Sequence, residues 1–240
     1  MCTREDISWR FNGSRPALIV LAGGLSRRFD GKNKILLEIG GKSILERLIT
    51  TFTPCVSTVY LSVRDNDQAS LIQARESRLS GSVQFITDAS AYTAGPIDGG
   101  NPRGLIRSPM TGLRACLTRL SETHTFVASG DMPFIKRDVL QVIVEYMNGD
   151  VEAVVPRWGN GYLEPTLALY NVQALDRAIE RCWHQERYQL VHAIQMLDHV
   201  SFIPVERIKK VDPYLDSFVN INDAADYEYA EQRESSFDAC

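Results

Sequence analysis

One short stretch of the chain concentrates residue types that bind anions. Residues 21–49 read LAGGLSRRFDGKNKILLEIGGKSILERLI and hold six basic against three acidic residues. The glycine pair at 23–24 ends an apolar run, so backbone N–H groups there can approach a phosphate without obstruction by a Cβ atom. The nearby cations Arg27, Arg28 and Lys34 can neutralise a triphosphate. The alternative is a tight turn with solvated charges, and the combination favours an anion site.

A second glycine-lysine pattern in the same stretch resembles a P-loop. Gly41, Lys42 and Ser43 follow a strand-like ILLEI and precede a helical pattern. The P-loop motif requires a glycine at position 36, where this chain has Leu36, so the loop cannot wrap a β-phosphate with its own N–H groups. We therefore expect Lys42 to be a surface residue in the turn before the helix.

A single aspartate stands where a magnesium ligand is expected. In FVASGDMPFI, residues 126–135, an apolar strand delivers Asp131 at its carboxyl end, and Pro133 stops the strand just beyond. Magnesium commonly uses one or two carboxylates together with substrate phosphate oxygens and waters. Asp131 is therefore predicted to bind metal, with a helix cap or turn former as the alternative.

The segment SFVNINDAADYEYA, residues 217–230, contributes two asparagines. Alternation predicts a short strand over 218–221, which would place Asn220 and Asn222 on one side of it. Asn222 is then placed to support the metal or a phosphate from across the cleft. An asparagine-led helix cap is an equal alternative. The acidic end of the chain, from Asp212 onward, is predicted to be a solvated helix face.

Apolar runs and helical periods alternate along the chain, which predicts a largely parallel sheet with helices on both faces. We expect one Rossmann-like α/β domain, a three-layer α/β/α sandwich with a mostly parallel mixed sheet and ligands at the carboxyl ends of the strands. The expected boundaries are an extension at 1–16 whose Trp9 and Phe11 pack on the domain, the domain at 17–234 and a tail at 235–240. Residues 88–108 break the rhythm and predict a long functional or disordered loop. The expected strands are 17–24, 56–63, 83–87, 124–129, 151–156, 162–170, 199–204 and 218–221, and the expected helices are 43–52, 66–78, 109–121, 136–147, 172–183, 188–197 and a closing helix.

Composition excludes several classes of protein. The 240 residues are 44% hydrophobic and 23% charged, which is an ordinary globular balance. A net charge of −4 argues against a duplex nucleic-acid binder. No apolar stretch is long enough to cross a membrane, so a cytoplasmic protein is expected. The five scattered cysteines predict reduced thiols, and the four histidines share no motif, which makes covalent catalysis a poor explanation.

The ordered motifs resemble those of the MobA-like nucleotidyltransferases. The family pattern LAGGxSxRMG, followed by DK and LL, is matched by Leu21, Ala22, Gly23, Gly24, Ser26, Arg28, Lys34, Leu36 and Leu37. Its DMPF segment is matched by residues 131–134, and its FxNINTPED ending by Phe218, Asn220, Ile221, Asn222, Asp223 and Asp226. Residues 108–113 loosely match its GPLAGL. The matches run in order from residue 18 to 227.

This resemblance implies a nucleotide-diphospho-sugar transferase type of fold and a Mg²⁺-dependent transfer of the GTP nucleotidyl group to the phosphate of molybdopterin. The products would be molybdopterin guanine dinucleotide and pyrophosphate, and other molybdenum cofactor biosynthesis proteins would be the partners. It implies catalytic roles for Lys34, Arg28 and Asp131, metal binding by Asp131 and Asn222, and acceptor binding by Asn220 and Asn222. The implied nucleotide-binding residues are Leu21, Ala22, Gly23, Gly24, Ser26, Arg27, Arg28, Lys34, Asp88 and Asp131.

Several positions depart from the family pattern. Phe29 and Asp30 replace Met-Gly, Asn33 replaces the aspartate before the lysine, and Ser62 stands where guanylyltransferases often place an asparagine. The 95–107 loop resembles an insertion. These departures leave open another base or acceptor, such as CTP, a phospholactate, cobinamide phosphate or a sugar phosphate. A non-catalytic nucleotide-binding regulator is the alternative from another class.

Overall fold

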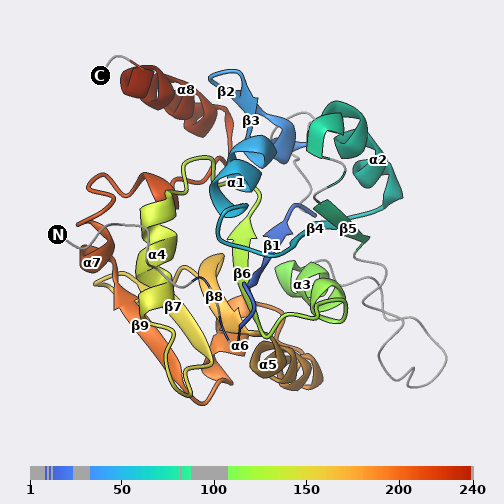
Figure 1. Cartoon of the computed structure of the whole chain (residues 1–240), viewed down its shortest axis with the longest axis vertical. Helices are drawn as coiled ribbons and strands as arrows, with labels where there is room; N and C mark the ends of the chain where they lie inside the picture. Colours follow the sequence, from blue (N-terminus) through green and yellow to red (C-terminus); the bar gives the residue numbers. More distant parts are fainter. Residues whose placement is uncertain are drawn as a thin grey trace.

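A seven-stranded sheet forms the centre of the molecule. The computed structural model describes residues 9, 11, 13–23, 33–79, 81, 83–87 and 108–238. The strand order is β5-β4-β1-β6-β8-β7-β9 (Figure 1), and β8 alone runs antiparallel to its neighbours. The predicted mostly parallel mixed sheet is confirmed. The strand bounds are β1 Ala17–Leu21, β4 Val59–Val63, β5 Val83–Thr87, β6 His124–Ser129, β7 Ala153–Arg157, β8 Leu167–Asn171 and β9 Val200–Pro204.

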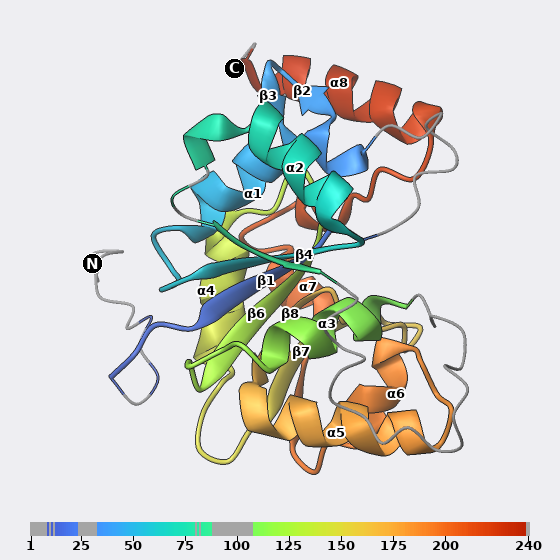
Figure 2. The ribbon, with the colours of Figure 1, turned by 90° about the vertical axis from the view of Figure 1, so that its right-hand side faces the viewer.

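Two hydrophobic cores lie on opposite faces of this sheet and give the three layers seen in Figure 2. One core packs the sheet against α1 Ile44–Phe52, α2 Asn66–Arg75, α4 Arg137–Glu145 and α7 Val205–Ile208. The other packs it against α3 Pro109–Leu117, α5 Val172–His184 and α6 Leu190–Gln195. Cys55, Cys116 and Cys182 are buried free thiols in these cores, as expected.

Local sequence explains where the elements begin. β1 is an uninterrupted apolar run, and four of its five residues are buried because helices cover both faces. Ser43 caps α1 by accepting the N–H of Glu46 at 3.0 Å, and Asn171 caps α5 by accepting the N–H of Ala174 at 3.0 Å. Strands β5 and β6 have the bounds expected from the apolar pattern.

The closing helix α8, Ala224–Asp238, lies beside the short hairpin of β2 Glu38–Ile39 and β3 Lys42–Ser43 (Figures 1 and 2). The Tyr227 hydroxyl donates to the carbonyl of Glu38 at 2.6 Å, and Arg47 of α1 forms an ion pair with Glu234. Helix α8 ends at Asp238 and so continues past the expected domain boundary at 234. At the other end of the chain, Trp9 and Phe11 pack against the first core, as expected.

The carboxyl ends of the paired parallel strands β1 and β6 approach each other closely at Gly130. Its N–H donates to the carbonyl of Leu21 at 3.0 Å. A Cβ atom on Gly130 would lie 2.9 Å from that carbonyl oxygen and 3.1 Å from Cδ1 of Ile35 in the 3₁₀ helix η2 Lys34–Leu36. The position therefore requires glycine, because the nearest atom belongs to the backbone of a buried strand and cannot move freely.

We predict that Gly130→Ala destabilises the fold by about 1–3 kcal/mol, the usual cost of overpacking a filled site. Gly81→Ala is the matched control, since a Cβ there meets nothing within 4 Å. Urea unfolding of the two variants would measure the difference. Equal stability of both variants would show that β1 and η2 adapt to the added methyl group.

Candidate active site

Asp131 lies directly after Gly130 and is held from two sides. The Ser129 hydroxyl donates to its Oδ1 at 2.6 Å, and the N–H of Ile221 donates to its backbone carbonyl at 2.9 Å. Among the described residues, its Oδ2 has no hydrogen-bond partner. The carboxylate is therefore oriented by protein contacts while one of its oxygens stays available to a ligand.

The predicted strand over 218–221 is wrong. Asp216–Phe218 form a 3₁₀ turn, η5, entered through Leu215 in the left-handed region at φ 57°. Residues 218–221 make local bonds, such as Asn220 Nδ2 to the carbonyl of Phe218 at 3.0 Å, and the Ile221 N–H donates to the carbonyl of Asp131. One cross-bond is not a strand ladder. The asparagines nevertheless lie on the segment that contacts Asp131.

Asn222 is not the cap of α8, so the asparagine-led cap is also wrong. Asp223 Oδ1 accepts the N–H of Asp226 at 3.1 Å, and Asp226 Oδ2 accepts the N–H of Asp223 at 3.2 Å, a reciprocal capping box. Asp226 also accepts the backbone N–H of Asn222 at 2.7 Å. This bond fixes the backbone of Asn222. Asn222 itself is exposed, so its side chain lies at the surface.

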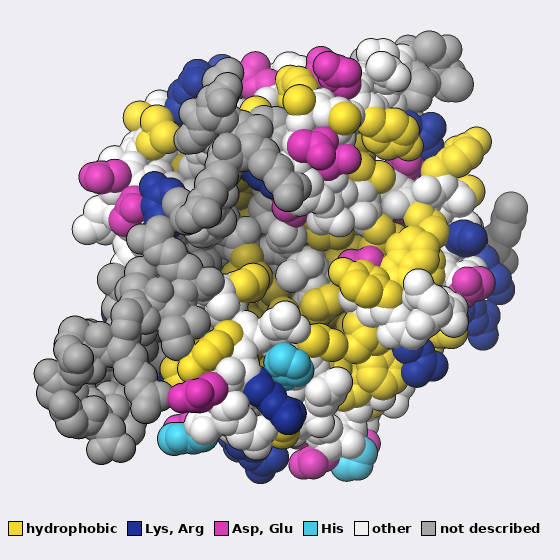
Figure 3. Space-filling view, turned by 180° about the vertical axis from the view of Figure 1, so that it is seen from behind, with side chains coloured by type: hydrophobic (Ala, Val, Ile, Leu, Met, Phe, Trp, Pro, Cys, Tyr) yellow, Lys and Arg dark blue, Asp and Glu magenta, His cyan; other side chains and the backbone are white. Residues whose placement is uncertain are grey.

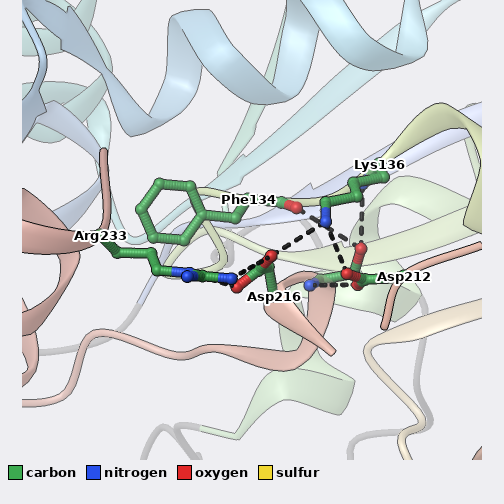
Figure 4. Close-up of polar contacts among 6 residues, drawn as sticks. Phe134, Lys136, Asp212, Asp216 and Arg233 are labelled. Atoms are coloured by element: carbon green, nitrogen blue, oxygen red, sulfur yellow. Dashed lines mark hydrogen bonds and ion pairs between the residues drawn. The ribbon is translucent and has the colours of Figure 1, made fainter. Parts of the chain in front are cut away.

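A buried ion network joins the loop after Asp131 to the carboxyl-terminal part of the chain (Figure 4). Lys136 Nζ lies 2.7 Å from Asp212 Oδ1 and 2.9 Å from Asp216 Oδ2, and Arg233 of α8 lies 2.8 Å from Asp216 Oδ1. The two aspartate side chains are 0% and 1% exposed. These acids are therefore part of the core, which corrects the expectation of a uniformly solvated acidic face.

The ionised forms of Asp216 and Lys136 are stabilised by their partners in this network. Burial alone would raise the pKa of Asp216, but hydrogen bonds from Arg233 and Lys136 outweigh it and lower that pKa. Burial alone would lower the pKa of Lys136, and its bonds to Asp212 and Asp216 raise it instead. Each group thus favours the ionised form that its partner needs.

The backbone polar groups at the end of β1 form hydrogen bonds with other parts of the protein. The carbonyl of Leu21 accepts from Gly130, and that of Ala22 accepts from the buried Gln68 side chain at 2.8 Å. The N–H of Ala22 donates to the carbonyl of Ser62, whose residue is 2% exposed. Gly23 follows at the carboxyl edge of the sheet. The polar groups of residues 21–22 therefore anchor the loop that follows.

Lys34 begins η2 and is half-buried. The next residue, Ile35, is buried against Gly130, so the backbone of Lys34 lies close to the loop of Asp131. The strand-like expectation for ILLEI is wrong over its first residues, because 34–36 form η2 and only Glu38–Ile39 pair with β3. Lys42 is exposed in that hairpin, as expected.

Several expected site residues lie outside the described part of the chain: Gly24, Ser26, Arg27, Arg28 and Asp88, together with the 95–107 loop. Within the described part, no group of three or more His, Cys, Asp or Glu side chains could hold a metal ion. Within the same part, no helix is long and apolar enough to span a membrane.

Sequence reasoning missed the residues that position the site. Ser129 lay inside the quoted 126–135 segment, two residues before the aspartate, and this spacing was a usable signal. Gln68 and the Lys136 network gave none, because their partners are 46 to 80 residues away in the chain.

Comparison with known proteins identifies the family. The profile of the MobA-like NTP transferase domain matches residues 18–200. The chain belongs to this family. It is therefore a nucleotidyltransferase.

Individual relatives agree with this assignment. A "Probable molybdenum cofactor guanylyltransferase" from Methanosarcina mazei is 34% identical over 211 residues, 88% of this chain and 87% of that protein. The structure of "Molybdopterin-guanine dinucleotide biosynthesis protein A" from Archaeoglobus fulgidus has a TM-score of 0.69 and 28% identity, covering 92% of this chain and 99% of that one. A 4-diphosphocytidyl-2C-methyl-D-erythritolsynthase from Anaerococcus prevotii, with a TM-score of 0.63, 14% identity and coverage of 91% and 95%, shares the fold. The predicted transferase type of fold is confirmed.

We predict that Lys136→Met lowers the free energy of unfolding by about 3 kcal/mol at pH 7, because it leaves buried carboxylates short of a countercharge. Exposed Lys210→Met is the control. A lowered aspartate pKa stabilises the folded protein at pH values above the ordinary pKa of aspartate. This stabilisation is lost as the pH falls toward the lower pKa of the folded state. The stability difference between Lys136→Met and wild type, measured by urea unfolding, should therefore be largest near pH 7 and should shrink as the pH falls and the carboxylates become protonated. A difference that does not change with pH, or equal stability of Lys136→Met and Lys210→Met at pH 7, would contradict this role.

Proposed function

We propose that the protein transfers the guanylyl group of GTP to the phosphate of molybdopterin, giving molybdopterin guanine dinucleotide and pyrophosphate. The observation that carries this proposal is the oriented Asp131 carboxylate, held next to the point where β1 enters the glycine-rich loop. The names of the relatives support the choice of GTP and of the molybdenum cofactor pathway. Other molybdenum cofactor biosynthesis proteins remain the expected partners.

The residues at Asp131 fit a magnesium ion. Magnesium keeps waters and binds substrate phosphates, so a site needs only one or two carboxylates from the protein. Asp131 has one oxygen directed by Ser129 and one without a partner among the described residues. Asn222, one residue after the Ile221 contact, would add an amide oxygen. When bound, the ion would neutralise phosphate charge.

In the proposed reaction, a phosphate oxygen of the acceptor forms a bond to the α-phosphorus of GTP, and the bond from that phosphorus to the bridging oxygen of pyrophosphate breaks. All the reacting groups are anionic, so positioning and charge neutralisation dominate the catalysis. We assign Lys34 and Arg28 to the triphosphate, with Gly23, Gly24, Ser26 and Arg27 supplying backbone and side-chain donors. Asn220 and Asn222 would contact the acceptor phosphate.

Guanine selectivity requires acceptors for the N1–H and 2-amino group of the base. The carbonyls of Leu21 and Ala22 already accept protein hydrogen bonds. We therefore assign guanine recognition to groups from Gly23 onward and to Asp88. A site that leaves such polar groups unpaired with another base would reject that base strongly.

The proposed function predicts pyrophosphate release only when GTP and molybdopterin are present together. Wild-type protein would be assayed with each of the four nucleoside triphosphates against molybdopterin, a phospholactate, cobinamide phosphate and a sugar phosphate. Faster release with CTP, or with any other acceptor, would contradict the proposal. Equal affinities for GTP, ATP and CTP would contradict only the guanine preference.

We predict that Asp131→Asn reduces turnover by about 100-fold or more and raises the Mg²⁺ concentration at half-maximal activity, because the amide lacks the charge. The fold should be intact, since the amide oxygen can still accept from Ser129. Asp150→Asn is the control, with its side chain 81% exposed. An unchanged Mg²⁺ concentration at half-maximal activity would contradict a metal-binding role and leave Asp131 as a turn former.

A further inference from the structure

A cavity of about 250 Å³ lies at the carboxyl ends of β7 and β9, apart from the residues already assigned. We name it the Trp158 pocket. Its lining residues are Arg157, Trp158, Gly159, Gly161, Pro204 and Glu206. Apolar side chains gather on the side of the molecule that carries β9 and α7 (Figure 3). In a sheet of this type, that edge is where ligands bind.

The indole of Trp158 is held by a hydrogen bond and a ring contact, and the backbone of Trp158 is held by two further hydrogen bonds. Its Nε1–H donates to Glu164 Oε1 at 2.7 Å, and its backbone N–H donates to the carbonyl of Tyr162 at 2.8 Å. The N–H of Gly161, a residue at φ +87°, donates to the carbonyl of Trp158 at 2.8 Å. The ring packs edge-on against Phe218, with the centroids 5.6 Å apart. The turn therefore presents one preset aromatic ring.

Glu164 is an unusual residue to use for this purpose. It is 8% exposed, and burial raises its pKa although the bond from Trp158 opposes the rise. A buried carboxyl group is costly. Here its side chain holds the indole, which indicates that the orientation of this ring matters to the protein.

The pocket also carries polar groups of both signs at its rim. Glu206 offers a carboxylate from α7, and the exposed Arg157 lies with its guanidinium 4.9 Å from the Phe202 ring centroid. A flat heterocycle could stack on an aromatic face. Neighbouring N–H donors on such a ring would pair with a carboxylate, as they do in charge-assisted hydrogen bonds. The 2-amino-4-oxopyrimidine edge, found in pterin and in guanine, has this pattern.

We propose that the Trp158 pocket binds the pterin ring of the acceptor, with the ring on the indole and its 2-amino edge on Glu206. This inference rests on the proposed function. β7 is two strands from β6, so its carboxyl end lies about 10 Å from that of β6 at ordinary strand spacing. A ring in the pocket and a phosphate near Asp131 thus belong to one extended acceptor. Phe218 joins the two places, because it packs on Trp158 three residues before Ile221 contacts Asp131.

The test uses free 6-hydroxymethylpterin, which has no phosphate, titrated into the full chain by calorimetry. Trp158→Ala should weaken binding at least about tenfold, and Trp158→Phe, which keeps an aromatic ring, should weaken it less. Glu206→Gln should weaken binding about tenfold through loss of charge. Exposed Glu180→Gln on α5 is the matched control and should bind as wild type does.

Two results would overturn the pocket assignment: no binding of the pterin to wild type at millimolar concentration, or equal binding by all variants. If Trp158→Ala does not fold, the exposed Glu206→Gln decides alone. Guanylyl transfer with unchanged KM for molybdopterin in both variants would overturn the pocket but leave the proposed function intact. Transfer to a different acceptor by a wild type that still binds pterin here would contradict the function instead.

Discussion

The site depends on how closely the backbones of β1 and β6 and the Ile35 side chain of η2 approach one another at Gly130. They leave no room there for a Cβ atom. The Leu21 carbonyl accepts the Gly130 N–H, so the strand that leads into the glycine-rich loop is tied to the strand that delivers Asp131. Lys34 and Asp131 are nearly 100 residues apart in the chain. The segments that carry them come together because a glycine lets Ile35 pack against the β6 loop.

A second set of contacts brings the carboxyl-terminal segment to the same place. The Ile221 N–H bonds to Asp131, but one hydrogen bond cannot hold an irregular segment. Asp212 and Asp216 supply the remaining constraint by binding Lys136 just after the Asp131 loop, and Arg233 extends the network to α8. Burying such charges brings little net stability, since desolvation opposes attraction. What the network does supply is a fixed register between two segments that share no strand ladder.

Most of the sheet could be predicted from the sequence because buried parallel strands are continuous apolar runs. β5 and β6 have their expected bounds, and Asp131 was expected at the end of β6 for the same reason. The strand expected over 218–221 failed because two asparagines in alternation look the same in a strand and in a turn closed by local bonds. The partners of Lys136 and Gln68 could not be found, since each pairing depends on tertiary structure and neither has a local pattern. Arg28 and Asp88, which lie outside the described residues, remain predictions.

The reversed direction of β8 explains how one sheet edge can serve two substrates. In a purely parallel sheet, the connection after β7 would cross a helix layer and return at the opposite edge. Because β8 is antiparallel to β7, the chain turns back directly, and residues 157–166 stay at the edge that carries Asp131. The N–H of Ser129 then donates to the carbonyl of Thr166 at 3.1 Å, which joins this turn to the residue that orients Asp131. The proposed nucleotide side, at β1 and β4, and the proposed acceptor side, at β7 and β9, therefore flank a single carboxylate on β6.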